Sequence, residues 1–244
     1  MELKENERID DLEYEGLKII QNSKWFCFGI DSVLLSDFAK KIKLNSKVLD
    51  IGTGTGIIPI LLSKKSKAKK FYAVEIQNDV AEMAKRSIFL NKLEDKIEII
   101  NDNIKNINNY LLNNTIDAIV TNPPYKKIST GKTNLEENKL ISRHEIECNL
   151  EEILKISSKL LKPKGEFYMV HRTERLGEII YKLKQNKLEP KQIRLIHSNI
   201  EKESKMVLIK AVKGGNEFVK VDKPLVIYDK DGNYTQEILK IYNK

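Results

Sequence analysis

The stretch "KVLDIGTGTG", residues 47–56, decides how this chain folds. Its first half is an apolar run with the length of a buried strand, and its second half places a glycine at every other position. Glycines that follow a strand allow a tight turn and let a ligand approach the backbone closely. The apolar segment 57–65 comes next, and Pro59 is compatible with a helix there because it lies in the first turn. The stretch therefore predicts a strand, a ligand-binding loop and a helix.

The same alternation continues toward the C-terminus. Further strands are expected at 69–76, 97–102, 116–122 and 167–171, with helices at 78–91, 104–112, 151–161 and 174–186. Strands that alternate with helices form a parallel, doubly wound sheet. The last two expected strands, 190–197 and 205–213, are joined by a short polar connection, so we expect them to pair antiparallel. Before the glycine loop, an apolar residue at every fourth position predicts a helix from Asp31 onward, with Asp31 or Ser32 near its N-cap.

Composition narrows the class of protein. The chain has 244 residues, of which 41% are hydrophobic, enough for the core of one large α/β domain. No apolar run has the roughly 20 residues of a membrane span, and the charged N-terminus lacks a signal peptide, so a cytoplasmic protein is expected. The two cysteines, Cys27 and Cys148, and the scattered histidines predict no metal site. A net charge of +8 favours a polyanionic partner.

The spacing of the glycines excludes two common loops. A dinucleotide fingerprint needs its third glycine where Ile57 or Pro59 stands, and a P-loop needs Gly-Lys-Ser/Thr at its end. The remaining pattern, Asp-x-Gly-x-Gly-x-Gly, resembles the cofactor loop of class I S-adenosylmethionine-dependent methyltransferases. This resemblance implies S-adenosyl-L-methionine as cofactor. It also implies a Rossmann-like α/β fold whose seven-stranded, mostly parallel sheet has an antiparallel C-terminal strand and helices on both faces.

Carboxylates follow the next two strands. Glu75 ends the second strand, where a carboxylate can accept both ribose hydroxyls of a bound cofactor. Asp102, with Asn103 behind it, follows the third strand, and the resemblance implies that this acidic position binds the adenine amino group.

The fourth strand ends in "NPPY", residues 122–125. This motif resembles the fourth motif of the amino-methyltransferases. The amine that these enzymes methylate is a poor nucleophile, because its lone pair is delocalised, and two acceptors aimed at its N–H bonds make it tetrahedral. The acceptors here are the Asn122 side-chain oxygen and the Pro123 carbonyl, while Pro123 and Pro124 stiffen the loop and Tyr125 stacks on the substrate. No histidine or carboxylate accompanies the motif, and none is needed, since the neutral amine can lose its proton afterwards.

The motif alone leaves open an adenine amine, a guanine amine and a glutamine amide. Residues 26–38, "FCFGIDSVLLSDF", resemble an N-terminal motif of the bacterial tRNA adenine-N6 methyltransferases that modify the purine next to the anticodon of a valine tRNA. Segments 142–145, 170–179 and 223–242 are similar to that family as well. The chain departs from it at Ile30, where Thr is frequent, and at Lys126, where an aromatic residue is common. The resemblance implies that Gly29 and Asp31 lie beside the methionine end of the cofactor.

Together these observations give the expected sites. The cofactor-binding residues are Gly29, Asp31, Asp50, Gly52, Thr53, Gly54, Gly56, Glu75, Ile76, Asp102, Asn103 and Asn122. The catalytic residues are Asn122, Pro123, Pro124 and Tyr125. The residues expected to contact the phosphates of a tRNA anticodon loop are Lys126, Lys127, Lys132, Arg143, Arg172 and Arg175.

The domain organisation follows from the same motifs. Residues 1–46 are an N-terminal extension that packs on the cofactor site, 47–213 form the methyltransferase domain, and 214–244 are a tail belonging to the same domain. Residues 126–139 have the composition and position of a substrate lid. We expect a monomer with neither a metal nor a membrane partner. The alternatives are a release-factor glutamine N5-methyltransferase, an rRNA guanine-N2 methyltransferase and a non-catalytic RNA-binding module.

Overall fold

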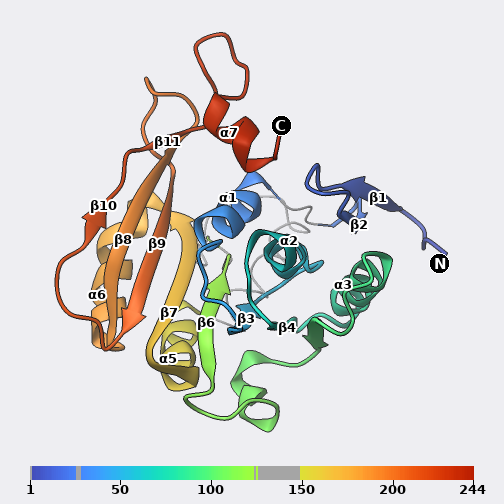
Figure 1. Ribbon diagram of the computed structural model, residues 1–244, viewed down its shortest axis with the longest axis horizontal. Coiled ribbons are helices and arrows are strands. Elements are labelled where there is room, and N and C mark those ends of the chain that lie inside the picture. The colour runs from blue at the N-terminus through green and yellow to red at the C-terminus, as the bar shows by residue number, and fades with distance from the viewer. Residues whose placement is uncertain (1, 26–28, 124, 126–148) are drawn as a thin grey trace, which may run out of the picture.

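A computed structural model of the chain describes residues 2–25, 29–123, 125 and 149–244 (Figure 1). Its centre is a nine-stranded sheet with the order β10-β8-β9-β7-β6-β3-β4-β5, in which β11 also pairs with β8. The strands are β3 (Lys47–Ile51), β4 (Lys70–Val74), β5 (Ile97–Ile100), β6 (Ile116–Thr121), β7 (Leu161–Arg172), β8 (Leu188–His197), β9 (Met206–Lys213), β10 (Lys220–Val221) and β11 (Leu225–Val226).

The direction of the strands confirms the predicted fold class. β3, β4, β5, β6 and β7 pair in parallel, and β9 runs antiparallel to both β7 and β8. β3 lies in the middle of the sheet and is buried from Val48 onward, as expected for a parallel strand covered on both faces. The two short strands β10 and β11 extend the edge beyond β8 and were not predicted.

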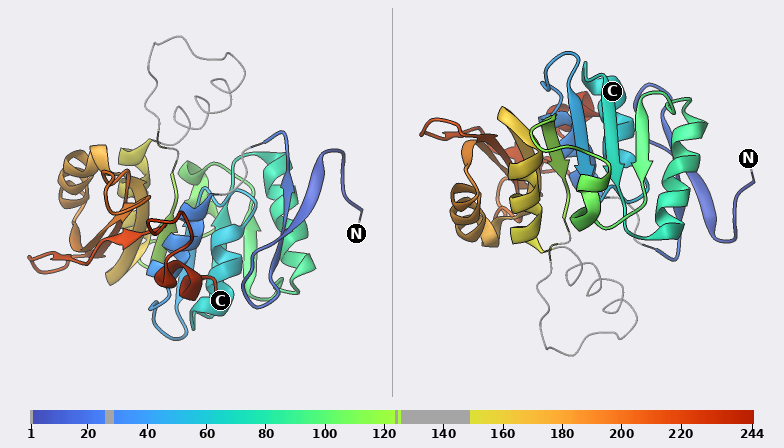
Figure 2. Two further views of the ribbon diagram at one scale, coloured as in Figure 1. Left: turned by 90° about the horizontal axis from the view of Figure 1, so that it is seen from above. Right: turned by 90° about the horizontal axis from the view of Figure 1, so that it is seen from below.

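Helices cover both faces of the sheet (Figure 2). They are α1 (Ile30–Phe38), α2 (Ile57–Lys65), α3 (Asn78–Leu90), α5 (Leu150–Leu160), α6 (Leu176–Gln185), α7 (Gln236–Ile241) and the 3₁₀ helices η1 (Ile104–Asn109) and η2 (Thr173–Arg175). Side chains from α1, α2, α3 and α7 share one apolar core with one face of the sheet. Side chains from η1, α5 and α6 form the other core. α2 is buried from Ile57 to Ser63 and packs against α1.

The N-terminal segment contains a hairpin that the sequence did not reveal. β1 (Glu7–Asp11) and β2 (Lys18–Asn22) pair antiparallel, although four of the five residues of β1 carry a full charge. The hairpin is anchored on α3, where both terminal nitrogens of Arg86 donate to the two carboxylate oxygens of Glu7 at 2.7 and 2.6 Å. The Ile20 amide also donates to Ser87 Oγ at 3.0 Å. Tertiary contacts rather than apolar alternation therefore hold these strands.

Two expected elements differ in the structure. The predicted helix 104–112 is the shorter 3₁₀ helix η1, which ends at Asn109. β7 begins at Leu161 instead of Phe167, and its pairing with β6 is irregular between Ile116 and Ala118. Lys164 has a positive φ of 63° in this irregular part, so the strand bends there before the regular pairing begins.

Candidate functional site

The C-terminal ends of β3, β4, β6 and β7 meet at one edge of the sheet. Because neighbouring parallel strands point the same way, the residues that follow them are brought together there. The edge carries the glycine loop after β3, Glu75 after β4, Asn122 after β6 and His171 near the end of β7. The first turn of α1 reaches the same place, since Asp31 and Ser32 contact Asn122. This is the edge at which open α/β sheets bind ligands.

The glycine loop is hydrogen bonded to β4 and leaves open space beside Gly54. The amides of Gly52 and Thr53 both donate to the Val74 carbonyl at 3.0 Å. Gly54 has a φ of +58°, and a Cβ atom added there would have no neighbour within 4 Å. Glu75 is buried below the loop, and its two carboxylate oxygens accept from the amides of Gly54 and Gln77, each at 3.0 Å. The loop therefore leaves space for a ligand and keeps a fixed carboxylate beside it.

Asp50 is a buried carboxylate without a partner. Its side chain is 1% exposed, and within the described part of the chain neither of its oxygens accepts a hydrogen bond. The pKa of the Asp50 carboxyl is raised to about 7, mainly because burial removes the hydration of the charged form; the nearby Thr53 hydroxyl opposes this shift and the Glu75 carboxylate adds to it. The Thr53 hydroxyl is buried and unpartnered as well. Such groups are costly unless a ligand satisfies them.

The side chains after β5 already have local partners. Asp102 accepts from the Asn103 amide at 2.6 Å, from Asn106 Nδ2 at 2.8 Å and from the Tyr110 hydroxyl at 3.0 Å. The Asn106 hydrogen bond is the main reason that the pKa of Asp102 lies below its ordinary value. Asn103 Oδ1 caps η1 by accepting from the Lys105 amide at 2.9 Å. Asp102 therefore lies where it was predicted and is ionised, but the Asn103 side chain is used for capping.

The Asn122 side chain lies between α1 and Tyr125. Its Nδ2 donates to Ser32 Oγ at 3.0 Å and, more weakly, to Asp31 Oδ2 at 3.4 Å. The Tyr125 hydroxyl lies within hydrogen-bond distance of Asn122 Oδ1 and, at 2.7 Å, of Asp31 Oδ2, two acceptors that share its one proton. Pro123 is buried behind Asn122, whereas Pro124 lies outside the described residues. The predicted acceptor Asn122 and the predicted cofactor residue Asp31 are thus in direct contact.

The ring of Tyr125 is enclosed by the end of β7. His171 meets it edge to face, with ring centroids 5.3 Å apart, and the Arg172 guanidinium lies 5.3 Å from its centroid. His171 Nδ1 accepts from the Arg172 amide at 2.8 Å, and burial lowers the pKa of its imidazole to about 4. The imidazole is therefore neutral and carries its proton on Nε2, so it cannot act as a base through that nitrogen. Its role here is to support the ring.

The predicted RNA-binding residues fall into two groups. Lys126, Lys127, Lys132 and Arg143 lie outside the described residues, as does the proposed lid 126–139. Arg172 is exposed beside Tyr125. The Arg175 side chain is only 14% exposed and donates two hydrogen bonds to Glu178, at 3.0 and 3.1 Å. Arg172 is therefore available to a polyanion, whereas the charge of Arg175 is largely neutralised.

Two residues of this site were not predicted. Ser32 and His171 are both almost fully buried and contact Asn122 and Tyr125, respectively. Ser32 is a polar residue at the start of an apolar helix, and His171 ends a predicted strand at the same edge as Asn122. Both residues could have been predicted from these positions in the sequence.

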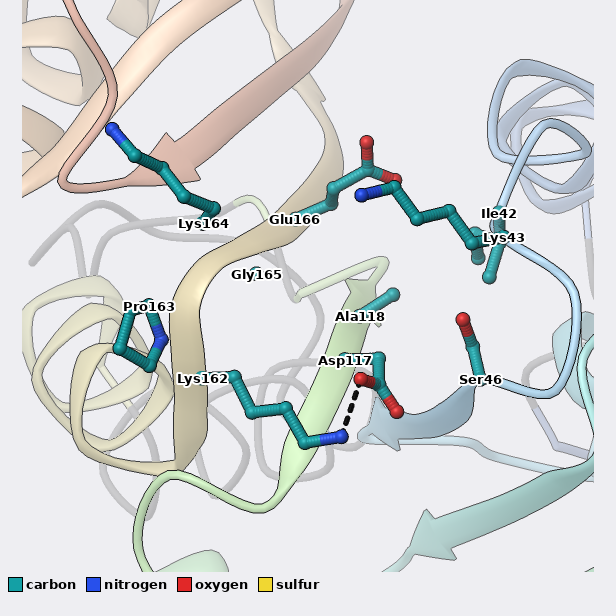
Figure 3. A pocket seen from close by; sticks show the side chains of 10 residues that line it. All are labelled: Ile42, Lys43, Ser46, Asp117, Ala118, Lys162, Pro163, Lys164, Gly165 and Glu166. Carbon is teal, nitrogen blue, oxygen red and sulfur yellow. Dashed lines mark hydrogen bonds and ion pairs between the residues drawn. The ribbon is translucent and has the colours of Figure 1, made fainter.

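A small cavity lies at the opposite edge of the sheet, where β3, β6 and β7 begin. It has a volume of about 100 Å³ and is lined by residues that include Ser46, Asp117 and Lys162. Figure 3 shows the Lys162 ammonium directed at Asp117, and the two are 2.6 Å apart. Both side chains are partly exposed, and the cavity is remote from the glycine loop and Asn122. It is not part of the candidate site.

Two further findings concern the described residues as a whole. Among them, no group of three or more histidine, cysteine, aspartate or glutamate side chains is arranged to hold a metal ion. None of their helices has both the length and the apolar character that crossing a bilayer demands.

Comparison with known proteins identifies the family. The methyltransferase small domain matches residues 29–189. The tRNA1(Val) (adenine(37)-N6)-methyltransferase of Porphyromonas gingivalis is 27% identical over 204 residues, which cover 82% of this chain and 79% of that protein.

Two solved structures share the fold. The crystal structure of a predicted O-methyltransferase from Agrobacterium tumefaciens matches with a TM-score of 0.70 at 20% identity, over 87% of this chain and 95% of that chain. TYW2 of M. jannaschii, in complex with AdoMet, matches with a TM-score of 0.58 at 15% identity, over 87% of each chain. The sheet order, the glycine loop and the family match agree with one another. The chain belongs to the methyltransferase small domain family.

Proposed function

We propose that this enzyme transfers a methyl group from S-adenosylmethionine to the exocyclic N6 of an adenine in tRNA, the purine 3′ of the anticodon of a valine tRNA. The observation that carries the proposal is the orientation of Asn122, whose amide nitrogen is bound by Ser32 and Asp31. Its oxygen therefore faces away from α1. An acceptor so placed after β6 suits an amine with N–H bonds to donate.

The residues at the sheet edge fit the cofactor. S-adenosylmethionine carries an activated methyl group on a sulfonium, together with ribose hydroxyls and an ammonium group. The unpartnered Asp50 carboxylate suits a cationic or N–H donating ligand, and the open space above Gly54 suits its close approach. Glu75 keeps lone pairs for two ribose hydroxyls, because one backbone amide donates to each of its oxygens and a carboxylate oxygen has two lone pairs. We propose that Asp102 binds the adenine of the cofactor and that Asp31 binds its methionine end.

The residues around Asn122 position the substrate amine for methyl transfer. The Asn122 oxygen and the Pro123 carbonyl accept the two N–H bonds of the substrate amine, which localises its lone pair for attack on the methyl carbon. The nitrogen–methyl bond forms as the sulfur–methyl bond breaks, and the extra proton leaves the nitrogen afterwards. In the described conformation the Tyr125 hydroxyl is bonded to the Asn122 oxygen. We propose that the base displaces this hydroxyl and then stacks on the Tyr125 ring.

Three observations support tRNA over the other acceptors. The relative from Porphyromonas gingivalis aligns over most of both chains and is named for this reaction. The net charge of +8 favours a polyanion over a protein substrate. Arg172 is exposed beside Tyr125, where the phosphates next to a flipped base would lie. Transfer RNA is modified in the cytoplasm, which is the compartment that we propose for this protein.

The test is a methylation assay with labelled S-adenosylmethionine. Total tRNA, rRNA and a cytosolic protein extract, each from cells that lack this gene, are offered separately, and the labelled product is identified by mass. We expect N6-methyladenosine in tRNA, and a loss of kcat of about a hundred- to a thousandfold in Asn122→Ala, with cofactor binding retained. Label in protein alone would move the function to glutamine methylation, and methylguanine in rRNA would move it to guanine methylation.

A further inference from the structure

The structure points to a residue that holds the Asn122 side chain in one orientation. An asparagine amide can be turned by 180° with little change in shape, and its hydrogen-bond partners decide which way it faces. Only one orientation directs the oxygen at the substrate amine. The reverse orientation would present an N–H donor to another N–H donor, and transfer would fail.

Two neighbours on α1 hold the Asn122 amide, and one of them, Asp31, discriminates between its orientations. Ser32 Oγ accepts from Asn122 Nδ2 at 3.0 Å, which is an ordinary hydrogen-bond distance. Asp31 Oδ2 lies 3.4 Å from the same nitrogen, and a carboxylate can only accept. A reversed amide would bring its oxygen against the Asp31 carboxylate. Asp31 therefore determines which orientation of the amide is preferred, and Ser32 makes the shorter hydrogen bond to it.

The surroundings make Ser32 a rigid partner. Its side chain is 4% exposed and lies in the first turn of α1, where its amide donates to the Gly29 carbonyl at 3.3 Å. A Cβ atom at Gly29 would come within 2.6 Å of Asp31 Oδ1, so glycine permits the approach of the Asp31 side chain. On the other side, the Thr121 hydroxyl donates to the Ile51 carbonyl at 2.9 Å and fixes the end of β6. Both the backbone and the amide of Asn122 are thus held.

We infer that Ser32 is a positioning residue, whose hydroxyl holds the Asn122 amide in the orientation that Asp31 selects, with the amide oxygen toward the substrate amine. Ser32 touches neither substrate nor cofactor in this role and acts only through Asn122. The inference rests on the proposed function for its kinetic consequence. How firmly the Asn122 amide is held can be measured without any substrate.

The chain offers a matched control on the same helix. Ser36 is fully buried in α1, and its hydroxyl donates to the Val33 carbonyl at 2.7 Å, away from Asn122. Both Ser32→Ala and Ser36→Ala remove one buried hydroxyl and introduce a good helix former. Any general effect on α1 should therefore be common to the two variants.

The kinetic test compares the two variants with tRNA as substrate. We expect Ser32→Ala to lower kcat about tenfold, with the Kd for S-adenosylmethionine and the KM for tRNA within about twofold of wild type. Ser36→Ala should retain wild-type kcat. Equal kcat values in the two variants would overturn the inference. A weakened cofactor Kd at unchanged kcat would also overturn it, because Ser32 would then act on the cofactor.

A second test needs no activity. In a ¹⁵N-labelled protein, the side-chain NH₂ signal of Asn122 is assigned by its absence in Asn122→Ala. Its exchange with solvent should be slow in wild type and in Ser36→Ala, and at least about tenfold faster in Ser32→Ala. Unchanged exchange in Ser32→Ala would overturn the inference. If wild type does not methylate tRNA, the proposed function fails, and this measurement still decides the role of Ser32.

Discussion

The unpartnered Asp50 carboxylate should make the stability of this protein depend on pH, and Asp50→Asn should remove that dependence. The carboxyl titrates near 3.8 in an unfolded chain and at about 7 in the folded protein. Between these values the folded state binds more protons than the unfolded state, so the free energy of unfolding falls as pH rises. At about 1.4 kcal/mol per pKa unit, the loss contributed by Asp50 is about 4 kcal/mol between pH 4 and pH 8.

The assay is urea unfolding of wild type and Asp50→Asn at several pH values from 5 to 8. About 3 kcal/mol of the loss falls in this range, so wild type should become less stable relative to the variant by that amount as pH rises. The neutral amide adds a cost that does not depend on pH, so the slope is the diagnostic quantity. Glu98→Gln, which changes an exposed carboxylate on β5, serves as control and should follow wild type. Parallel profiles for wild type and Asp50→Asn would refute the reasoning.

The same carboxylate should couple cofactor binding to pH. If the cofactor stabilises the ionised form of Asp50, its binding includes the loss of a proton below pH 7. The Kd for S-adenosylmethionine should then fall by up to about tenfold per pH unit between pH 5 and pH 7 in wild type, and less in Asp50→Asn.

Three further predictions follow from single contacts. Tyr125→Phe should keep kcat within about threefold, because the ring that stacks remains. Tyr125→Ala should raise the KM for tRNA by about tenfold or more. Equal losses of kcat/KM in the two variants would contradict this. Arg172→Ala should weaken tRNA binding and flatten its dependence on salt, measured by filter binding, and Arg175→Ala should do so less because Glu178 already pairs with Arg175. Arg86→Ala should lower the free energy of unfolding by about 3 kcal/mol, because it removes the ion-pair partner of the nearly buried Glu7 carboxylate; a change below about 1 kcal/mol in urea unfolding would refute this account of the hairpin.

The amino-acid sequence by itself determined the strand, glycine loop and helix at residues 47–65, and the alternation that follows. These features depend on local patterns, since apolar runs and glycine positions act within a few residues. The edge along which Glu75, Asp102 and Asn122 lie also follows from sequence, because neighbouring parallel strands end on the same side of the sheet. Their roles in binding and catalysis remain predictions. The charged β1–β2 hairpin was not predicted from the sequence, because Arg86 and Glu7, which anchor it, are 79 residues apart.

Only the tertiary structure decided what surrounds Asn122. In the sequence no carboxylate or histidine stands beside the motif, yet Asp31 and Ser32 reach it from 91 and 90 residues away. His171 joins the site because β7 lies next to β6, which brings its imidazole against the ring of Tyr125. Such contacts depend on how α1 packs across the sheet edge and on which strands are neighbours. Neither can be predicted from local periodicity, so the partners that orient Asn122 are seen only in the folded chain.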